Sequence, residues 1–456
     1  MIPLPLFTTT SLLSIATPHS INIIANSTWG EVGELTFDEE LMRVHVEEKS
    51  GDVLVAAELI EKSDVAAPRQ TIEVKLPEKL HLSIETDGDV VVNGKVEGDT
   101  TLTSKLGDIT VNKLRGHNLT LYALSGSVKV SNLLEADCAS VKSGLQITAK
   151  KVMGREMNIS VVDNDDNIGD KFDKCILNDD NRESENNNDE SSCNEINGQE
   201  FDNKGTNHGT LARIQIDSLY TTNTSTKSSV PTKISYEGSA VHSAVEVGVA
   251  HGGLEIDCVF DENDALVSDE NCHAIDLKGI SGFVSSSITN KSAKAYHPNK
   301  YTTKIHYSQV PKATRSSISS DCGDVEVSFS EGVECTVDML ACGFGSSIDI
   351  TDGVTFISQE AGEGNKIIKG RVKMDASLDS NTPNFNQGAG KISFDAAGSQ
   401  SLHAFTQNGM NDSKDKDDDG HISIRSSGNN TIRLKGQDSW IDNIAKSLGI
   451  DMATLK

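Results

Sequence analysis

One short phrase recurs at nearly constant spacing near the start of the chain. Its copies are Gly88-Asp89-Val90-Val91-Val92, Gly107-Asp108-Ile109-Thr110-Val111, Gly126-Ser127-Val128-Lys129-Val130 and Gly144-Leu145-Gln146-Ile147-Thr148. The glycines are 19, 19 and 18 residues apart. In the first three copies, apolar residues follow glycine at the second and fourth positions, which is typical of a strand with one buried face. In the fourth copy we interpret Leu145 and Ile147 as the apolar pair. A period near 20 residues indicates a solenoid.

A second set of phrases lies at the half period, over 98–102, 116–121 and 136–141. We therefore expect each repeat to hold two short strands and two turns, with like strands stacked in parallel. Glycine permits positive φ at the turns, and a neighbouring Asp can hydrogen-bond to the local backbone. This pattern predicts a single-stranded β-helix over 71–162.

These repeats, written G-D-[VI]-x-V with a half-period companion, resemble the putative-adhesin domains of unknown function, also called toastrack domains. The resemblance is best over about 80–160 and extends to 20–24 and 30–33. It implies a right-handed β-helix with a noncatalytic role in binding or scaffolding, and it implies no catalytic residues. The chain departs from that pattern because it lacks adjacent membrane spans and carries long polar inserts.

The whole chain is predicted to be one all-β solenoid. Its parts are N-terminal strands leading into the repeats (1–70), the regular β-helix (71–162), a disordered acidic insert (163–209), further solenoid with loop inserts (210–437) and a C-terminal capping helix (438–456). Polar loops are expected at about 261–274, 290–315, 376–389 and 408–419.

The acidic insert holds 14 Asp or Glu against four Lys or Arg. Such a segment cannot bury enough apolar surface to offset its ordering entropy. It is either a tolerated loop insertion or an acidic tether.

The last segment changes period. Asp438 or Ser439 can cap a helix in which Trp440, Ile441, Ile444 and Leu448 form one apolar stripe. Because the ends of a solenoid expose core and strand edges, we interpret this helix as a cap. A helix that binds a partner is the alternative.

The net charge of −27 opposes binding to nucleic acid and to anionic membranes. No apolar run is long enough for a transmembrane helix, and neither a signal peptide nor a transit peptide is evident. An intracellular location is therefore favoured. None of the eight cysteines forms a C-x-x-C pair, so we expect buried reduced thiols.

One acidic segment, 415–422, resembles half of a calcium-binding loop. Asp415, Asp417 and Asp419 stand at its first, third and fifth positions, and Gly420 at its sixth. Position twelve is Ser426 rather than a bidentate Glu. An acidic turn is one interpretation; weak calcium binding through the three aspartates is the other. No other cofactor is expected.

The sequence lacks G-x-S-x-G, H-E-x-x-H and a complete P-loop. The expected function is therefore noncatalytic, with a rigid solenoid surface presented to a protein or glycan partner. The alternative is a β-helix lyase or hydrolase acting on a polysaccharide, with acids from Asp89, Asp99 and Asp108. The small aromatic content, 4%, offers few platforms for sugar rings.

Overall fold

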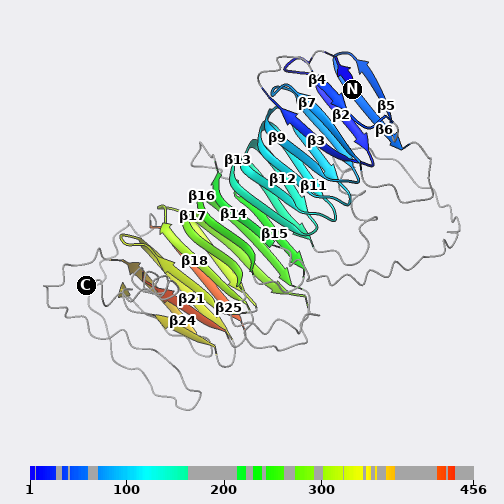
Figure 1. The fold of residues 1–456 in the computed structure, drawn as a ribbon. Coiled ribbons are helices and arrows are strands. Elements are labelled where there is room, and N and C mark those ends of the chain that lie inside the picture. The colour runs from blue at the N-terminus through cyan, green and yellow to red at the C-terminus, as the bar shows by residue number, and fades with distance from the viewer. Residues whose placement is uncertain are drawn as a thin grey trace, which may run out of the picture.

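A computed structural model describes the protein over residues 1–5, 7–26, 33–39, 42–59, 70–162, 213–221, 230–238, 243–260, 273–291, 301–321, 323–342, 346–350, 355–356, 366–374, 419–427 and 430–436. Over these ranges the protein is all-β, and no helix is long and apolar enough to cross a membrane. The strands join in one 26-stranded sheet that forms an elongated stack (Figure 1).

The strands are β1 (Ile2–Leu4), β2 (Leu12–Thr17), β3 (Ser20–Ala25), β4 (Gly33–Thr36), β5 (Met42–Lys49), β6 (Asp52–Leu59), β7 (Thr71–Leu76), β8 (His81–Thr86), β9 (Val90–Glu97), β10 (Thr100–Ser104), β11 (Ile109–Ala123), β12 (Val128–Ser143), β13 (Gln146–Val162), β14 (Arg213–Thr221), β15 (Thr232–Gly238), β16 (Ser243–Phe260), β17 (His273–Asn290), β18 (Thr302–Gln309), β19 (Arg315–Ser320), β20 (Val325–Phe329), β21 (Glu334–Cys342), β22 (Ser347–Ile350), β23 (Thr355–Phe356), β24 (Lys366–Lys373), β25 (His421–Ser427) and β26 (Thr431–Lys435).

The repeats predicted from the glycine spacing stack in parallel and in register. Ile109 of β11 pairs with Val90 of β9 on one side and with Val128 of β12 on the other. Val128 in turn pairs with Ile147 of β13. Each repeat therefore bonds its backbone to the repeats before and after it, which confirms the predicted parallel stacking.

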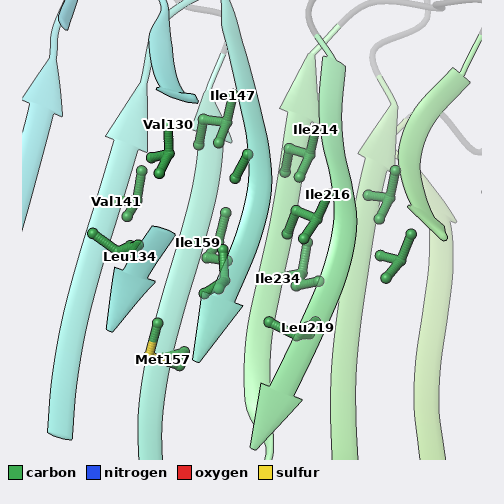
Figure 2. Packing of buried hydrophobic residues seen from close by; sticks show 14 of the residues in the cluster. Val130, Leu134, Val141, Ile147, Met157, Ile159, Ile214, Ile216, Leu219 and Ile234 are labelled. Carbon is green, nitrogen blue, oxygen red and sulfur yellow. The ribbon is translucent and has the colours of Figure 1, made fainter. Parts of the chain in front are cut away.

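Inward side chains build a continuous apolar core along the stack. Ile109, Val111, Leu114 and Leu121 of β11 are all fully buried. Figure 2 shows the same packing further along, where apolar side chains of β12 to β15 meet in the interior. Burial of each such side chain contributes about 1.5–3 kcal/mol.

The row of β11 has three stretches of buried positions rather than the two that we predicted, whereas the repeat before it consists of two strands, β9 and β10, as predicted. In β11 the buried positions alternate at Ile109 and Val111, resume at Leu114, and resume again at Leu119. The ladder to β12 changes register between Val111 and Lys113. This bend was not predicted, because it is formed by two consecutive half-buried residues, Asn112 and Lys113, and neither Gly nor Pro marks it in the sequence.

The predicted apolar pair of the fourth copy, Leu145 and Ile147, lies two residues before the buried pair. Ile147 and Ala149 are the buried pair, whereas Leu145 is half-buried. The amide of Leu145 donates to the carbonyl of Gly126 at 3.3 Å, so Leu145 takes the place that glycine has in the preceding repeat. The turn of this copy is one residue shorter: three residues lie between Ser143 and Ile147, against four between their partners Ala123 and Val128.

The ladder continues directly across the predicted acidic insert. Ile147 and Ala149 of β13 pair with Ile214 and Ile216 of β14. The insert itself, 163–209, lies outside the described residues. The chain therefore resumes the next row of the stack with β14.

β18 contradicts the predicted polar loop over 290–315. Thr303, Ile305 and Tyr307 are buried and alternate with more polar positions, and the strand pairs in parallel with β17 and β20. The apolar periodicity is weak here because threonine takes one inward position and because Lys304 and His306 interrupt the run.

The first strands of the chain do not lie at the end of the stack. β2 lies between β6 and β8, and β3 lies between β7 and β9, all in parallel. The carboxylate of Asp52, at the start of β6, accepts the amide of Leu12 at 3.0 Å. The segment 12–25 thus fills a row that the chain skips between β7 and β8.

The last described strands do the same at the other end. β25 lies between β19 and β21, and β26 lies between β20 and β22. In Figure 1 the red strand β25 accordingly lies beside the yellow strand β21. Both ends of the stack are therefore completed by segments that are distant in sequence.

Antiparallel strands cover the outermost rows. β5 pairs with β6 and β4 pairs with β7 at one end, while β24 pairs with β21 at the other. Antiparallel pairing ends the parallel stack and protects strand edges. The predicted capping helix, 438–456, lies outside the described residues. A strand over 366–374 was expected from the sequence, but its antiparallel pairing with β21 was not.

Replacing Leu121 with alanine tests the core. Leu121 is fully buried and pairs in register with Leu102 and Val141 of the adjacent rows. We expect a loss of about 2–5 kcal/mol in the free energy of unfolding because a cavity forms. Urea unfolding followed by circular dichroism measures it. The neighbouring, outward-facing Thr120→Ala is the control, expected within about 0.5 kcal/mol of the wild type. Equal midpoints for both variants would contradict this packing.

Candidate functional site: a groove across successive repeats

Aspartates of the Gly-Asp phrases join one row to the next. Asp89 Oδ1 accepts the amide of Asp108 at 2.9 Å, and Asp108 Oδ1 accepts the amide of Ser127 at 2.7 Å. The repeated Gly-Asp turns thus provide hydrogen bonds between rows, in agreement with turn chemistry. Each of these carboxylates has one oxygen held by a backbone donor.

A second corner of the repeats is hollowed into a groove of about 430 Å³. Its floor is formed by Gly98, Gly116, Ala136 and Gly154, which follow one another in successive rows. A Cβ atom on Gly116 would lie 2.4 Å from the carbonyl oxygen of Gly98, and one on Gly154 would lie 2.5 Å from that of Ala136. The backbone at Gly116 and Gly154 thus approaches the preceding row too closely for a Cβ atom, whereas Ala136 carries its methyl group at the same register position.

One rim of the groove carries an ion pair. Arg115, Glu135 and Met153 occupy one register position in three successive rows. The Arg115 guanidinium donates to Glu135 Oε1 at 2.8 Å. Because both side chains are partly exposed, this pair adds little stability, and its charges can reach a ligand.

The other rim alternates acid and base. Asp99 Oδ1 accepts the amides of His117 and Asn118 at 3.0 and 2.9 Å. His117 Nδ1 lies 2.7 Å from Asp137 Oδ2. Further along, His81 Nδ1 accepts the amide of Asp99 at 3.0 Å. This chain of contacts fixes the side chains along the rim.

These contacts shift the protonation of the rim. Partial burial acts to raise the pKa of Asp99, but the amides of Asn118 and His117 outweigh it and hold that pKa below its ordinary value. The hydrogen bond to Asp137, followed by the charges of Asp137 and Asp99, raises the pKa of His117. These contacts therefore favour the charged forms of Asp99 and His117.

The groove presents hydrogen-bonding and charged groups of both signs above a floor without large side chains. No group of three or more His, Cys, Asp or Glu side chains is arranged to hold a metal ion in the part of the chain that the structure describes. The arrangement can bind an elongated polar ligand along the stack through its two rims.

Of the predicted calcium ligands, Asp419 is described, whereas Asp415 and Asp417 lie outside the described residues. Asp419 Oδ2 lies 2.9 Å from the guanidinium of Arg371, which also contacts Glu334 at 3.0 Å. The Asp419 carboxylate is therefore already neutralised by a cation of the protein. Calcium binding at 415–420 stays a prediction.

Four cysteines lie within the described residues, Cys138, Cys258, Cys335 and Cys342, and all four are free thiols. Cys335 is fully buried, and this burial raises the pKa of its thiol to about 12. The predicted buried thiols are found at Cys258 and Cys335, whereas Cys138 and Cys342 are unpaired but only half-buried. An unreactive, protonated Cys335 fits a packing role.

The groove was not predicted from the sequence, although Asp99, on its rim, was named as a candidate acid. Gly98, Gly116 and Ala136 were recognised as members of the half-period phrases, whereas Arg115, Glu135 and Asp137 received no role. A usable signal was present, because the residues before and after each of these small residues are charged or histidine in three consecutive repeats.

The rim predicts an elevated titration midpoint for His117. Asp137 stabilises the imidazolium, so the pair is intact below the ordinary histidine pKa and is lost as the pH rises through the raised value. NMR titration of the imidazole should give a midpoint above 6.5, which falls toward that value in Asp137→Asn. The same midpoint in both proteins would contradict the contact, and Lys129→Gln, on another stretch of the repeat, is the control.

Comparison with known proteins gives no close relative. No protein-family model matches the chain, and no curated protein matches it. A putative cell adhesion protein from Clostridium sporogenes ATCC 15579 of known structure aligns over 94% of this chain and 92% of its own, with 9% sequence identity and a TM-score of 0.13. A TM-score this low establishes neither a shared fold nor a shared function.

Proposed function

We propose that this chain is a noncatalytic, adhesin-like scaffold whose groove binds an extended protein or glycan partner. The observation that carries the proposal is the groove over Gly98, Gly116, Ala136 and Gly154, with charged rims fixed by hydrogen bonds. A rigid row of repeats holds such groups in place before a ligand arrives, so less ordering entropy is lost on binding.

We further infer that the repeats wind as a β-solenoid. Parallel pairing at a constant step of 19 residues, from Val90 through Ile109 and Val128 to Ile147, supports it. Parallel strands joined by a crossover in one sheet are right-handed in nearly all proteins. A right-handed winding is therefore proposed.

The ligand is proposed to be polar and elongated. Neighbouring rows of a sheet are about 4.8 Å apart, so the rims offer hydrogen-bonding groups at regular steps along the stack. Both an extended peptide and a glycan can use such groups. The net charge of −27 disfavours nucleic acid as the partner.

The state of the aspartates supports a noncatalytic role. Asp89, Asp99 and Asp108 each direct a carboxylate oxygen to backbone amides of the next row. A general acid needs a raised pKa, whereas the pKa of Asp99 is lowered. The alternative, a polysaccharide lyase or hydrolase, would be favoured by robust turnover in a glycan-cleavage screen that is lost on replacing these aspartates.

Charge reversal on the rim tests the binding site. A ligand is first selected with the wild-type protein on glycan and peptide arrays, and its Kd is then measured by biolayer interferometry. Arg115→Glu should weaken binding by about 10-fold or more, because a hydrogen bond to a charged group contributes about 1.5–3 kcal/mol.

The matched control is Lys129→Glu, which reverses an exposed charge in β12 outside the groove. It changes the net charge by the same amount. Equal weakening by both variants would point to a general electrostatic effect, and unchanged binding by Arg115→Glu would remove the groove as the site.

Solution scattering tests the solenoid. A compact globular chain of 456 residues has a radius of gyration of about 23 Å. We expect a larger value and a linear cross-section Guinier region, as for a rod. A symmetric, bell-shaped distance distribution would contradict the proposed solenoid.

A further inference from the structure

The row occupied by β25 and β26 is a slot that the rest of the chain leaves between two repeats. β20 ends at Phe329 and β21 begins at Glu334, yet the two strands belong to rows separated by β25 and β26. Gly332, at φ +78°, lies in the connection between them, and its amide donates to Met374 at 3.0 Å. The connection is therefore anchored by residues other than the occupant of the slot.

The occupant fills the slot with the same interactions as any other repeat. The inward side chains Ile422, Ile424, Ile432 and Leu434 are at most 1% exposed. Asp324, in a Gly-Asp phrase, accepts the amide of Thr431 at 2.8 Å. It thus binds the row that is next in space, which is 107 residues away in sequence.

Charged pairs match the occupant to this slot. Arg433 Nη1 lies 2.7 Å from Asp324 Oδ2, and the same guanidinium approaches Asp349 in the next row at 3.9 Å. Lys435 contacts Glu326 at 2.8 Å. Two bases of the occupant therefore face three acids of the slot.

The equivalent slot at the other end differs in its connections. Its occupant, β2 and β3, is joined to β4 by residues 26–32 only. β25 instead follows β24 after 47 residues, 374–420. A chain of that length spans at most about 160 Å, which is enough to reach a neighbouring molecule.

We propose that this slot accepts the 421–435 segment of a second copy of the chain as well as its own, so that two copies associate by exchanging β25 and β26. The interactions are identical in both cases, because each slot meets the same segment. The chain's own segment and the segment of a second copy compete for the slot. The chain's own segment has the advantage of a high effective concentration, because it is covalently linked to the slot. The wild-type protein is accordingly monomeric when dilute, and the exchanged dimer gains as concentration rises.

Charge reversal can force the exchange. One variant reverses the segment, Lys435→Glu, and the other reverses the slot, Glu326→Lys. Arg433 is kept because it pairs with Asp324. Asp324 is kept because it holds the Thr431 amide. In each variant the slot and the chain's own segment carry like charges and repel each other. In a mixture of the two variants, each slot meets a segment of opposite charge from the other variant.

The two variants are unfolded together, refolded and separated by size-exclusion chromatography with light scattering. We expect a 1:1 dimer at least 10-fold more abundant than in either variant alone. The control carries both substitutions in one chain and should refold as a monomer. A mixture that stays monomeric while this control folds would overturn the proposal.

A second measurement needs no charge reversal. Ser347 and Thr431 are register partners whose hydroxyl oxygens lie 3.0 Å apart. A chain carrying only Ser347→Cys and one carrying only Thr431→Cys are refolded together at about 100 μM and oxidised. Paired strand positions suit a disulfide. Mass spectrometry should find the two positions joined between chains; their absence from every cross-linked species would also overturn the exchange.

Discussion

Every row of this protein depends on its neighbours for its backbone hydrogen bonds. A parallel strand leaves its own donors and acceptors unpaired until another strand lies on each side. The rows of β9, β11, β12 and β13 satisfy this at a fixed step, and aspartates such as Asp108 add a bond to the next row. The interior needs only modest apolar side chains, because the rows enclose it. Unpaired backbone donors and acceptors therefore arise at the two ends of the stack, where no further parallel strand follows.

The two ends of the stack pair their outer strands in the same two ways. Each terminal segment occupies the row next to the last, and an antiparallel strand covers the last row. Asp52 and Asp324, both from Gly-Asp phrases, bind the amides of those terminal segments. A motif that joins consecutive repeats in the middle of the protein therefore joins distant segments at its ends.

The middle of the fold was predictable, since glycine spacing and alternating apolar residues report directly on turns and buried faces. The order of the rows at the ends was not predictable. An aspartate in a Gly-Asp phrase binds the row that lies next in space, and the phrase has the same sequence whether that row is near or distant along the chain. β18 was missed because threonine can occupy an inward position. The rims of the groove were missed for a related reason: charged side chains such as Arg115 and Asp137 lack a periodic apolar signal, and only the register brings them together.

The position of β25 and β26 also bears on how the protein is made. Translation delivers the N-terminal rows first, and they can pair as they emerge. The row of β21 and β22 is synthesised well before its parallel neighbour, the row of β25 and β26. The ion pair of Asp324 with Arg433 can therefore form only after residue 433 has been synthesised. Contacts between such distant residues form slowly. The newborn chain therefore carries an incomplete end until residues 421–435 have left the ribosome, and the rows on either side of β25 and β26 gain their parallel neighbour only then.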